Sequence, residues 1–149
     1  MNEDEKWMSL ALEQAVKAEE QGEVPVGAIL IKDGLLIARA YNQPISSNDP
    51  TAHAEIQLIR AAGAKLKNYR LTGTSLYVTL EPCAMCLGAI MHARVERIIF
   101  GAYDPKTGVC GSSENFMDSN CFNHKISLVS GVLENESKHL LKKFFIARR

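Results

Sequence analysis

The residues best suited to chemistry in this chain lie in two short motifs. The first is His-Ala-Glu at 53–55, and the second is Pro-Cys-Ala-Met-Cys at 82–86. One imidazole and two thiolates suit Zn²⁺, which prefers tetrahedral nitrogen and sulfur ligation. Three protein ligands leave the fourth position open to water, which is typical of a catalytic zinc site. We therefore predict that His53, Cys83 and Cys86 bind one Zn²⁺ per chain.

Glu55 has the right chemistry to act beside that open position as a general acid and base. Zinc lowers the pKa of a bound water toward ~7, and a nearby carboxylate can then carry protons to the substrate. Residues two apart on a regular helix point ~200° apart. His53 and Glu55 can therefore converge only at the first turn of a helix, and the turn-forming residues 49–51 predict a helix beginning there.

The elements that position these motifs follow from hydrophobic periodicity and turn residues. Asp33-Gly34 predicts a tight hairpin between two strands. Residues 104–124 are expected to form a loop that contains a short helix near 112–118. The pattern predicts helices at 4–21, 52–65, 83–93 and 132–147, and strands at 26–32, 35–41, 75–80, 97–103 and 126–130.

The order of these elements predicts an α/β fold. Strand, helix and strand over 75–103 form a βαβ unit, and apolar strands without alternation indicate burial on both faces. We expect a three-layer α/β/α sandwich with a mixed five-stranded sheet and an N-terminal hairpin. Ligands of such sheets bind at the carboxyl ends of the strands, and both motifs should lie at that edge.

Length and composition set the protein class. The chain has 149 residues, of which 46% are apolar and 23% charged, so we expect one globular domain over 1–149. This composition excludes a disordered chain, and four cysteines are too few for a small disulfide scaffold. The longest apolar run, about 24–31, is far shorter than the ~20 residues that span a bilayer. Without a basic-then-apolar leader, we expect a cytoplasmic protein with reduced thiols.

The charge distribution is uneven. Seventeen basic and seventeen acidic residues cancel, which disfavours a protein that binds nucleic acid over its whole surface. Residues 138–149 nevertheless contain five basic residues and no acidic one. This asymmetry predicts a local contact with a polyanion, and the alternative is a solvated terminal helix.

With these features, the sequence resembles those of the bacterial tRNA-specific adenosine deaminases, a family within the zinc-dependent cytidine and deoxycytidylate deaminase superfamily. Several segments outside the metal motifs carry the resemblance, and they span nearly the whole chain. The matching segments are 23–28, 42, 49–55, 76–83, 85–86, 100–102, 104, 106–108, 144–145 and 148–149.

The resemblance implies a cytidine deaminase-like fold and a homodimer that converts the wobble adenosine of a tRNA anticodon stem-loop to inosine. It implies that His53, Cys83 and Cys86 bind zinc and that Glu55 is the proton shuttle. Asn42 matches the asparagine that contacts the base in this family.

Further residues are expected to contact the substrate. Val24, Asp104 and Lys106 lie in segments that line the family's nucleotide pocket or RNA groove. The C-terminal residues offer cations for phosphates and aromatic rings that either stack on RNA or pack the last helix. These possible RNA contacts are Lys142, Lys143, Phe144, Phe145, Arg148 and Arg149.

Three alternative functions remain open. A guanine deaminase is the nearest, because that group shares the two metal motifs. A cytidine or deoxycytidylate deaminase would use the same chemistry on another base. A non-catalytic, zinc-structured RNA-binding subunit is the third, and Glu55 argues against it because a structural metal site does not need this carboxylate.

Overall fold

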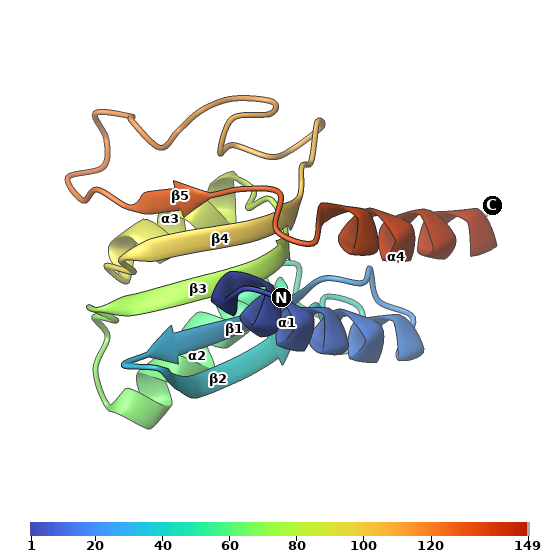
Figure 1. Cartoon of the computed structure of the whole chain (residues 1–149), viewed down its shortest axis with the longest axis horizontal. Coiled ribbons are helices and arrows are strands. Elements are labelled where there is room, and N and C mark those ends of the chain that lie inside the picture. Colours follow the sequence, from blue (N-terminus) through green and yellow to red (C-terminus); the bar gives the residue numbers. More distant parts are fainter. Residues whose placement is uncertain (149) are drawn as a thin grey trace.

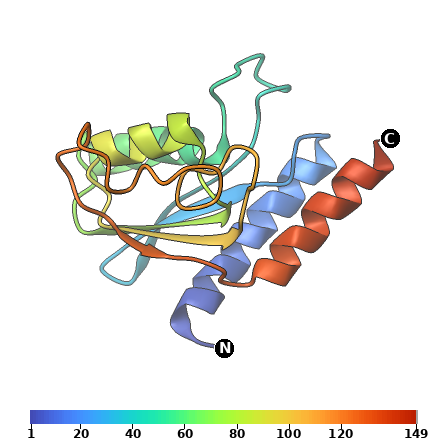
Figure 2. The same cartoon turned by 90° about the horizontal axis from the view of Figure 1, so that it is seen from above.

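In the computed structural model, which describes residues 1–148, a five-stranded sheet separates two pairs of helices. Helices α1 and α4 lie side by side on one face, and α2 and α3 cover the other (Figure 1 and Figure 2). This is the predicted three-layer sandwich. The elements are α1 (Glu3–Glu20), β1 (Gly27–Lys32), β2 (Leu35–Tyr41), α2 (Ala54–Leu66), β3 (Thr74–Leu80), α3 (Ala84–His92), β4 (Arg97–Ala102), β5 (Ser127–Val129) and α4 (Glu134–Ala147).

The strand order is β2-β1-β3-β4-β5. Strand β1 runs antiparallel to both neighbours, whereas β3, β4 and β5 are parallel to one another. The hairpin between β1 and β2 turns at Asp33 and Gly34, whose φ angles of 51° and 73° are those of a type I′ turn. Because β1 reverses the chain between them, β2 and β3 point the same way. The carboxyl ends of β2, β3 and β4 therefore meet at one edge of the sheet.

The central strands are buried on both faces, which accounts for their continuous apolar sequences. In β3, Leu76 and Val78 pack in the core under α2 and α3, whereas Tyr77 packs in the core under α1. In β4, Ile98 packs in the core under α2 and α3, and Ile99 packs in the core under α1. Within residues 1–148, no helix combines the length and the apolar character needed to cross a bilayer.

The predicted short helix near 112–118 is not formed. Cys110 and Asn115 instead make an isolated antiparallel bridge. The backbone N–H groups of Cys110 and Ser112 donate to the carboxylate of Glu81, which is distant in sequence. These long-range hydrogen bonds outweigh the local preference for a helix.

Helix α4 is held close to the sheet by a glycine. A Cβ atom at Gly101 of β4 would lie 2.5 Å from Ser137 Oγ of α4 and 2.7 Å from the carbonyl oxygen of Thr79. Ser137 itself is buried. Only glycine therefore allows the first turns of α4 to approach β4 this closely.

The start of α1 is anchored to the sheet by a polar cluster. Asn2 and Glu5 form a capping box at its N-terminus. The hydroxyl of Tyr77, a buried residue of β3, donates to Asp4 Oδ1 at 2.6 Å, and Arg97 pairs with Asp4 Oδ2 at 3.3 Å. Burial and the neighbouring Asp4 carboxylate raise the pKa of Tyr77, so it stays a hydrogen-bond donor.

We expect the substitution Tyr77→Phe to lower the free energy of unfolding by about 1–3 kcal/mol, because it removes a buried hydrogen bond to a charged group. Urea unfolding measures this. Tyr41→Phe is the matched control, because the Tyr41 hydroxyl accepts a hydrogen bond from Gln21 at an exposed site. Equal effects of the two substitutions would contradict the anchoring role of Tyr77.

Candidate metal centre and active site

The three predicted metal ligands converge at the sheet edge where β2 and β3 end. His53 Nδ1 lies 3.7 Å from Cys83 Sγ and 3.5 Å from Cys86 Sγ. All three candidate ligand atoms lie within 4.8 Å of one another, and no other such group of three occurs within residues 1–148. The two motifs, about thirty residues apart in sequence, thus form one site.

Helix starts place these side chains. His53 and Cys83 are the N-cap residues of α2 and α3, with extended backbone (ψ 157° and 175°), and neither makes a side-chain capping hydrogen bond. Because His53 precedes the helix, the ~200° separation between residues two apart in a helix does not apply to it and Glu55. Pro82 lies immediately before the N-cap residue Cys83.

The donor set fits zinc. Zn–S and Zn–N bonds of about 2.3 Å and 2.05 Å in a tetrahedral site place nitrogen and sulfur about 3.5–3.6 Å apart. The two His53–cysteine distances, 3.5 Å and 3.7 Å, bracket this separation. The positive ends of two helix dipoles also favour deprotonated cysteines here.

The electrostatics of the group favour a cation. Hydrogen bonds from Cys86 and His53 lower the pKa of Cys83 to about 4, so this thiol is ionised at neutral pH. The hydrogen bond to Cys83 raises the pKa of His53, and the same neighbour raises that of Cys86. A divalent cation bound by His53, Cys83 and Cys86 would displace the protons that these three side chains share.

Glu55 is the buried carboxyl group of the site. It occupies the second position of α2, and only 4% of its surface is exposed. Burial raises the pKa of Glu55 to about 7, and the negative charge on Cys83 adds to this effect. A carboxyl group with this pKa can both accept and release a proton near neutral pH.

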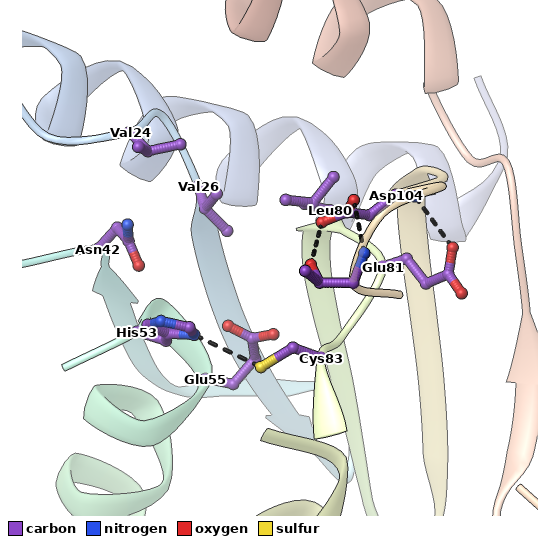
Figure 3. Close-up of a pocket in the computed structure, with 10 residues that line it drawn as sticks. Val24, Val26, Asn42, His53, Glu55, Leu80, Glu81, Cys83 and Asp104 are labelled. Carbon is purple, nitrogen blue, oxygen red and sulfur yellow. Dashed lines mark hydrogen bonds between the residues drawn. The ribbon is translucent and has the colours of Figure 1, made fainter. Parts of the chain in front are cut away.

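These groups open into a cavity of about 190 Å³, shown in Figure 3. Its walls come from the segments before β1 and after β2, β3 and β4, all of which lie at the same sheet edge. Asn42 is nearly buried and faces the cavity from the end of β2. The lining residues are Val24, Val26, Asn42, His53, Glu55, Leu80, Glu81, Cys83, Asp104 and Thr107.

Lys106 and Asp104 are placed differently from each other. Asp104 lines the cavity, but its carboxylate accepts hydrogen bonds from the backbone of Lys106 and from Thr107 within its own turn. Lys106 does not line the cavity. It contributes to an adjoining groove of about 460 Å³ that the cavity meets at Val24 and Leu80.

The C-terminal residues divide into buried and exposed groups. Phe144 is only 5% exposed and lies under the guanidinium of Arg148, 3.5 Å from the ring centroid, so of the two roles expected for it, it packs the last helix in this structure. Phe145 is 55% exposed and lines the groove. Lys142 is exposed, and Lys143 pairs with Glu19 at 3.6 Å. Arg149 lies outside the described residues.

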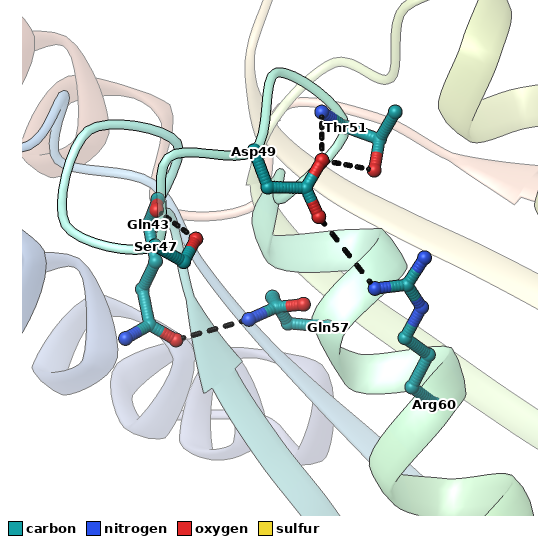
Figure 4. A network of polar contacts seen from close by, with 6 residues as sticks. All are labelled: Gln43, Ser47, Asp49, Thr51, Gln57 and Arg60. Carbon is teal, nitrogen blue, oxygen red and sulfur yellow. Dashed lines mark hydrogen bonds and ion pairs between the residues drawn. The ribbon is translucent and has the colours of Figure 1, made fainter.

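The loop that leads to His53 is held by its own polar network, shown in Figure 4. Asp49 accepts hydrogen bonds from the backbone N–H and hydroxyl of Thr51, and it pairs with Arg60 of α2 at 3.7 Å. Gln57 of α2 donates to the side chain of Gln43 at 3.2 Å. Contacts to α2 at two points thus orient the segment between Asn42 and His53.

Sequence reasoning missed two buried glutamates. Glu23 and Glu81 are 1% and 2% exposed, and each accepts hydrogen bonds from backbone N–H groups of a loop beside the cavity. Each lies one or two residues before a proline, where the chain leaves or enters the sheet. Both also lie in segments that carry the family resemblance, 23–28 and 76–83, but those segments gave the two glutamates no role of their own.

Comparison with known proteins identifies the family of this chain. The cytidine and deoxycytidylate deaminase zinc-binding region matches residues 1–102. The chain belongs to this family. The tRNA-specific adenosine deaminase of Haemophilus influenzae is 50% identical over 98% of this chain and 85% of its own length. These findings confirm the predicted family.

Solved structures confirm the fold. A structure from work on A-to-I editing by tRNA:A34 deaminases at the wobble position superimposes with a TM-score of 0.89 and 47% identity, covering 91% of this chain and 99% of the other. The guanine deaminase of Bacillus subtilis superimposes with a TM-score of 0.67 and 34% identity, covering 99% and 94%.

We expect the purified chain to contain about one zinc ion, and the substitution Cys86→Ala to abolish its binding, because two remaining ligands cannot form the site. Inductively coupled plasma mass spectrometry measures the content. Cys110→Ala is the matched control: it is also a buried thiol, but burial raises the pKa of Cys110 to about 12 and it lies outside the ligand group. Zinc retained in the Cys86 variant would refute the ligand assignment.

Proposed function

We propose that this chain is a zinc-dependent tRNA adenosine deaminase that converts the wobble adenosine of an anticodon to inosine and releases ammonia. The observation that carries the proposal is that two of the grouped ligands, His53 and Cys83, line one cavity together with Glu55 and Asn42. It is supported by similarity to a tRNA-specific adenosine deaminase over 98% of the chain and to a tRNA:A34 deaminase structure over 91%.

His53, Cys83 and Cys86 would hold one zinc ion. When bound, the ion would act as a Lewis acid that makes water nucleophilic at neutral pH. Hydrolysis adds the elements of water at C6 of adenine and breaks the bond from C6 to the amino nitrogen. Glu55 accepts the proton of the attacking water and delivers it to the ring nitrogen N1. A second proton, from the hydroxyl group added at C6, then passes through Glu55 to the amino group, which leaves as ammonia while C6 becomes a carbonyl carbon.

The rest of the cavity suits a planar base. Val24, Val26 and Leu80 offer apolar surface to the faces of a purine ring. The amide of Asn42 has both a donor and an acceptor, so it can form hydrogen bonds with the ring edge. Because Asn42 is nearly buried, leaving this amide without a partner would cost binding energy, and this favours bases with matching groups.

A loop nucleotide is a suitable substrate for this site. The reacting base must leave its stack to enter the cavity, and this costs least for an unpaired base of an anticodon loop. The C-terminal parts of α1 and α4 extend past the sheet edge beside the site, and α4 carries the exposed Lys142 and Phe145 there (Figure 1). They would contact the phosphates and bases that flank the target.

The proposal includes a homodimer, which the resemblance implies, and a cytoplasmic location. All four cysteines of the chain are free thiols, as expected for a reducing compartment where tRNA is also present.

We expect the zinc-loaded chain to form inosine and ammonia from a synthetic anticodon stem-loop with adenosine at the wobble position, and not to deaminate free guanine or cytidine. Glu55→Ala should reduce turnover by at least about 10²–10⁴-fold, because it removes the general acid and base. Zinc should remain, because Glu55 is not among the grouped ligands.

Glu13→Ala, at an exposed position of α1, is the control and should retain activity. Deamination of guanine but not of the stem-loop would favour the guanine deaminase alternative. Loss of zinc in the Glu55 variant would make Glu55 a ligand and refute its role as proton carrier.

The basic residues near the end of α4 give a second prediction. Lys142→Gln should weaken stem-loop binding at low salt and lower the slope of log K against log salt by about one, because one phosphate contact is lost. Fluorescence anisotropy over a range of salt concentrations measures the slope. Lys65→Gln, at the exposed far end of α2, should leave it unchanged. An unchanged slope for both variants would remove Lys142 from the RNA site.

A further inference from the structure

Glu81 occupies the connection between the sheet and the metal ligands. It follows Leu80, the last residue of β3, and it comes two residues before Cys83. Its backbone N–H donates to the carbonyl oxygen of Ala102 at 2.8 Å, which extends the pairing between β3 and β4. Its side chain is buried, and it points away from the metal group in Figure 3. The reaction described above gives this carboxylate no role.

The carboxylate binds one loop. Oε1 accepts a hydrogen bond from the backbone N–H of Asp104 at 3.0 Å and another from the hydroxyl of Ser112. Oε2 accepts the backbone N–H groups of Cys110 at 2.9 Å and Ser112 at 3.1 Å. No ion pair involves Glu81 within residues 1–148. The burial of this carboxylate is therefore compensated by the loop at 104–112 alone.

Gly108 shows how closely the loop surrounds the carboxylate. A Cβ atom there would lie 2.4 Å from Glu81 Cδ and 2.6 Å from both Glu81 Oε1 and the carbonyl oxygen of Asp104. Gly108 does not adopt a left-handed conformation, so the restriction on this residue is one of space. Val109 adds a backbone hydrogen bond to Pro82 at 3.1 Å. The loop thus rests directly on the segment that leads to the ligand Cys83.

The same loop forms one wall of the cavity. Asp104 and Thr107 line both the cavity and the adjoining groove, and Lys106 lines the groove. In Figure 3, Asp104 and Glu81 lie on the side of the cavity opposite Asn42. The position of this wall relative to the metal ligands therefore depends on the hydrogen bonds of the Glu81 carboxylate, besides the backbone bond from Val109 to Pro82.

We propose that Glu81 is a positioning residue: it holds the 104–112 loop against the metal-ligand segment and so sets the affinity for the substrate without acting on the metal. The part of this inference that concerns the substrate rests on the proposed function. The part that concerns the loop does not.

The test is Glu81→Gln in the zinc-loaded full chain. The new amide nitrogen cannot accept hydrogen bonds, so one oxygen's contacts to Asp104 or to Cys110 and Ser112 are lost. Amide hydrogen exchange should show lost protection at these residues, with β1 and β3 unchanged. Zinc content should not change. KM for the stem-loop should rise about tenfold, the factor for one lost hydrogen bond to a charged group, with kcat nearly constant. Glu114→Gln, an exposed carboxylate two residues beyond the loop, is the matched control.

Gly108→Ala is an independent second variant, because its methyl group would displace the loop from an intact Glu81. It should reproduce the exchange and KM changes, and the double variant should be no worse than the stronger single one. Unchanged exchange and KM in Glu81→Gln would overturn the proposal. So would a loss of zinc, or a loss of protection over the whole sheet. A wild-type chain inactive on the stem-loop would refute the proposed function, and the exchange measurements would still decide the role of Glu81.

Discussion

Two helices in this protein begin at residues whose side chains serve a shared site instead of capping their own helix. A side chain that caps the N-terminus of a helix is worth about 0.5–2 kcal/mol, and neither His53 nor Cys83 makes that hydrogen bond. Their extended backbone instead directs an imidazole and a thiol toward each other. This arrangement requires the carboxyl ends of β2 and β3 to meet, and the antiparallel β1 between them makes that possible. The strand order β2-β1-β3 thus brings the segments that carry His53 and Cys83 to the same edge of the sheet.

Local patterns in the sequence were sufficient for features that are decided locally. Asp33-Gly34 specifies a hairpin through its backbone preferences, the uninterrupted apolar strands report burial on both faces, and a His-x-Glu and a Cys-x-x-Cys motif at two helix starts define a donor set. The features that were missed depend on contacts between distant segments. The 112–118 region lacks its predicted helix because Glu81, about thirty residues earlier, binds the amide of Ser112, and Asn115 pairs with Cys110. Phe144 is buried on α4, which packs beside α1, and the composition of the tail could not decide between this packing and a contact with RNA.

Two walls of the cavity are held in the same way, each by a buried glutamate that accepts hydrogen bonds from a loop. Loops carry their backbone amides at the surface, where water competes for them, and a buried carboxylate can order such a loop because it must be satisfied by several donors. Glu23 accepts the amides of Ile45 and Ser46 on one side, and Glu81 accepts those of the 104–112 loop on the other. The substrate-facing surface is therefore built from irregular segments that are nevertheless fixed to the sheet.

The close contact of Gly101 with Ser137 fixes how near the first turn of α4 lies to β4. Eight residues, or about 12 Å of helix, separate Ser137 from Phe145 at the wall of the groove. A methyl group at position 101 would collide with Ser137 Oγ and with the carbonyl oxygen of Thr79, so the start of α4 would have to move away from β4. Because Phe145 belongs to the same helix, the space left by one glycine near the end of β4 bears on the wall of the groove as well as on the sheet.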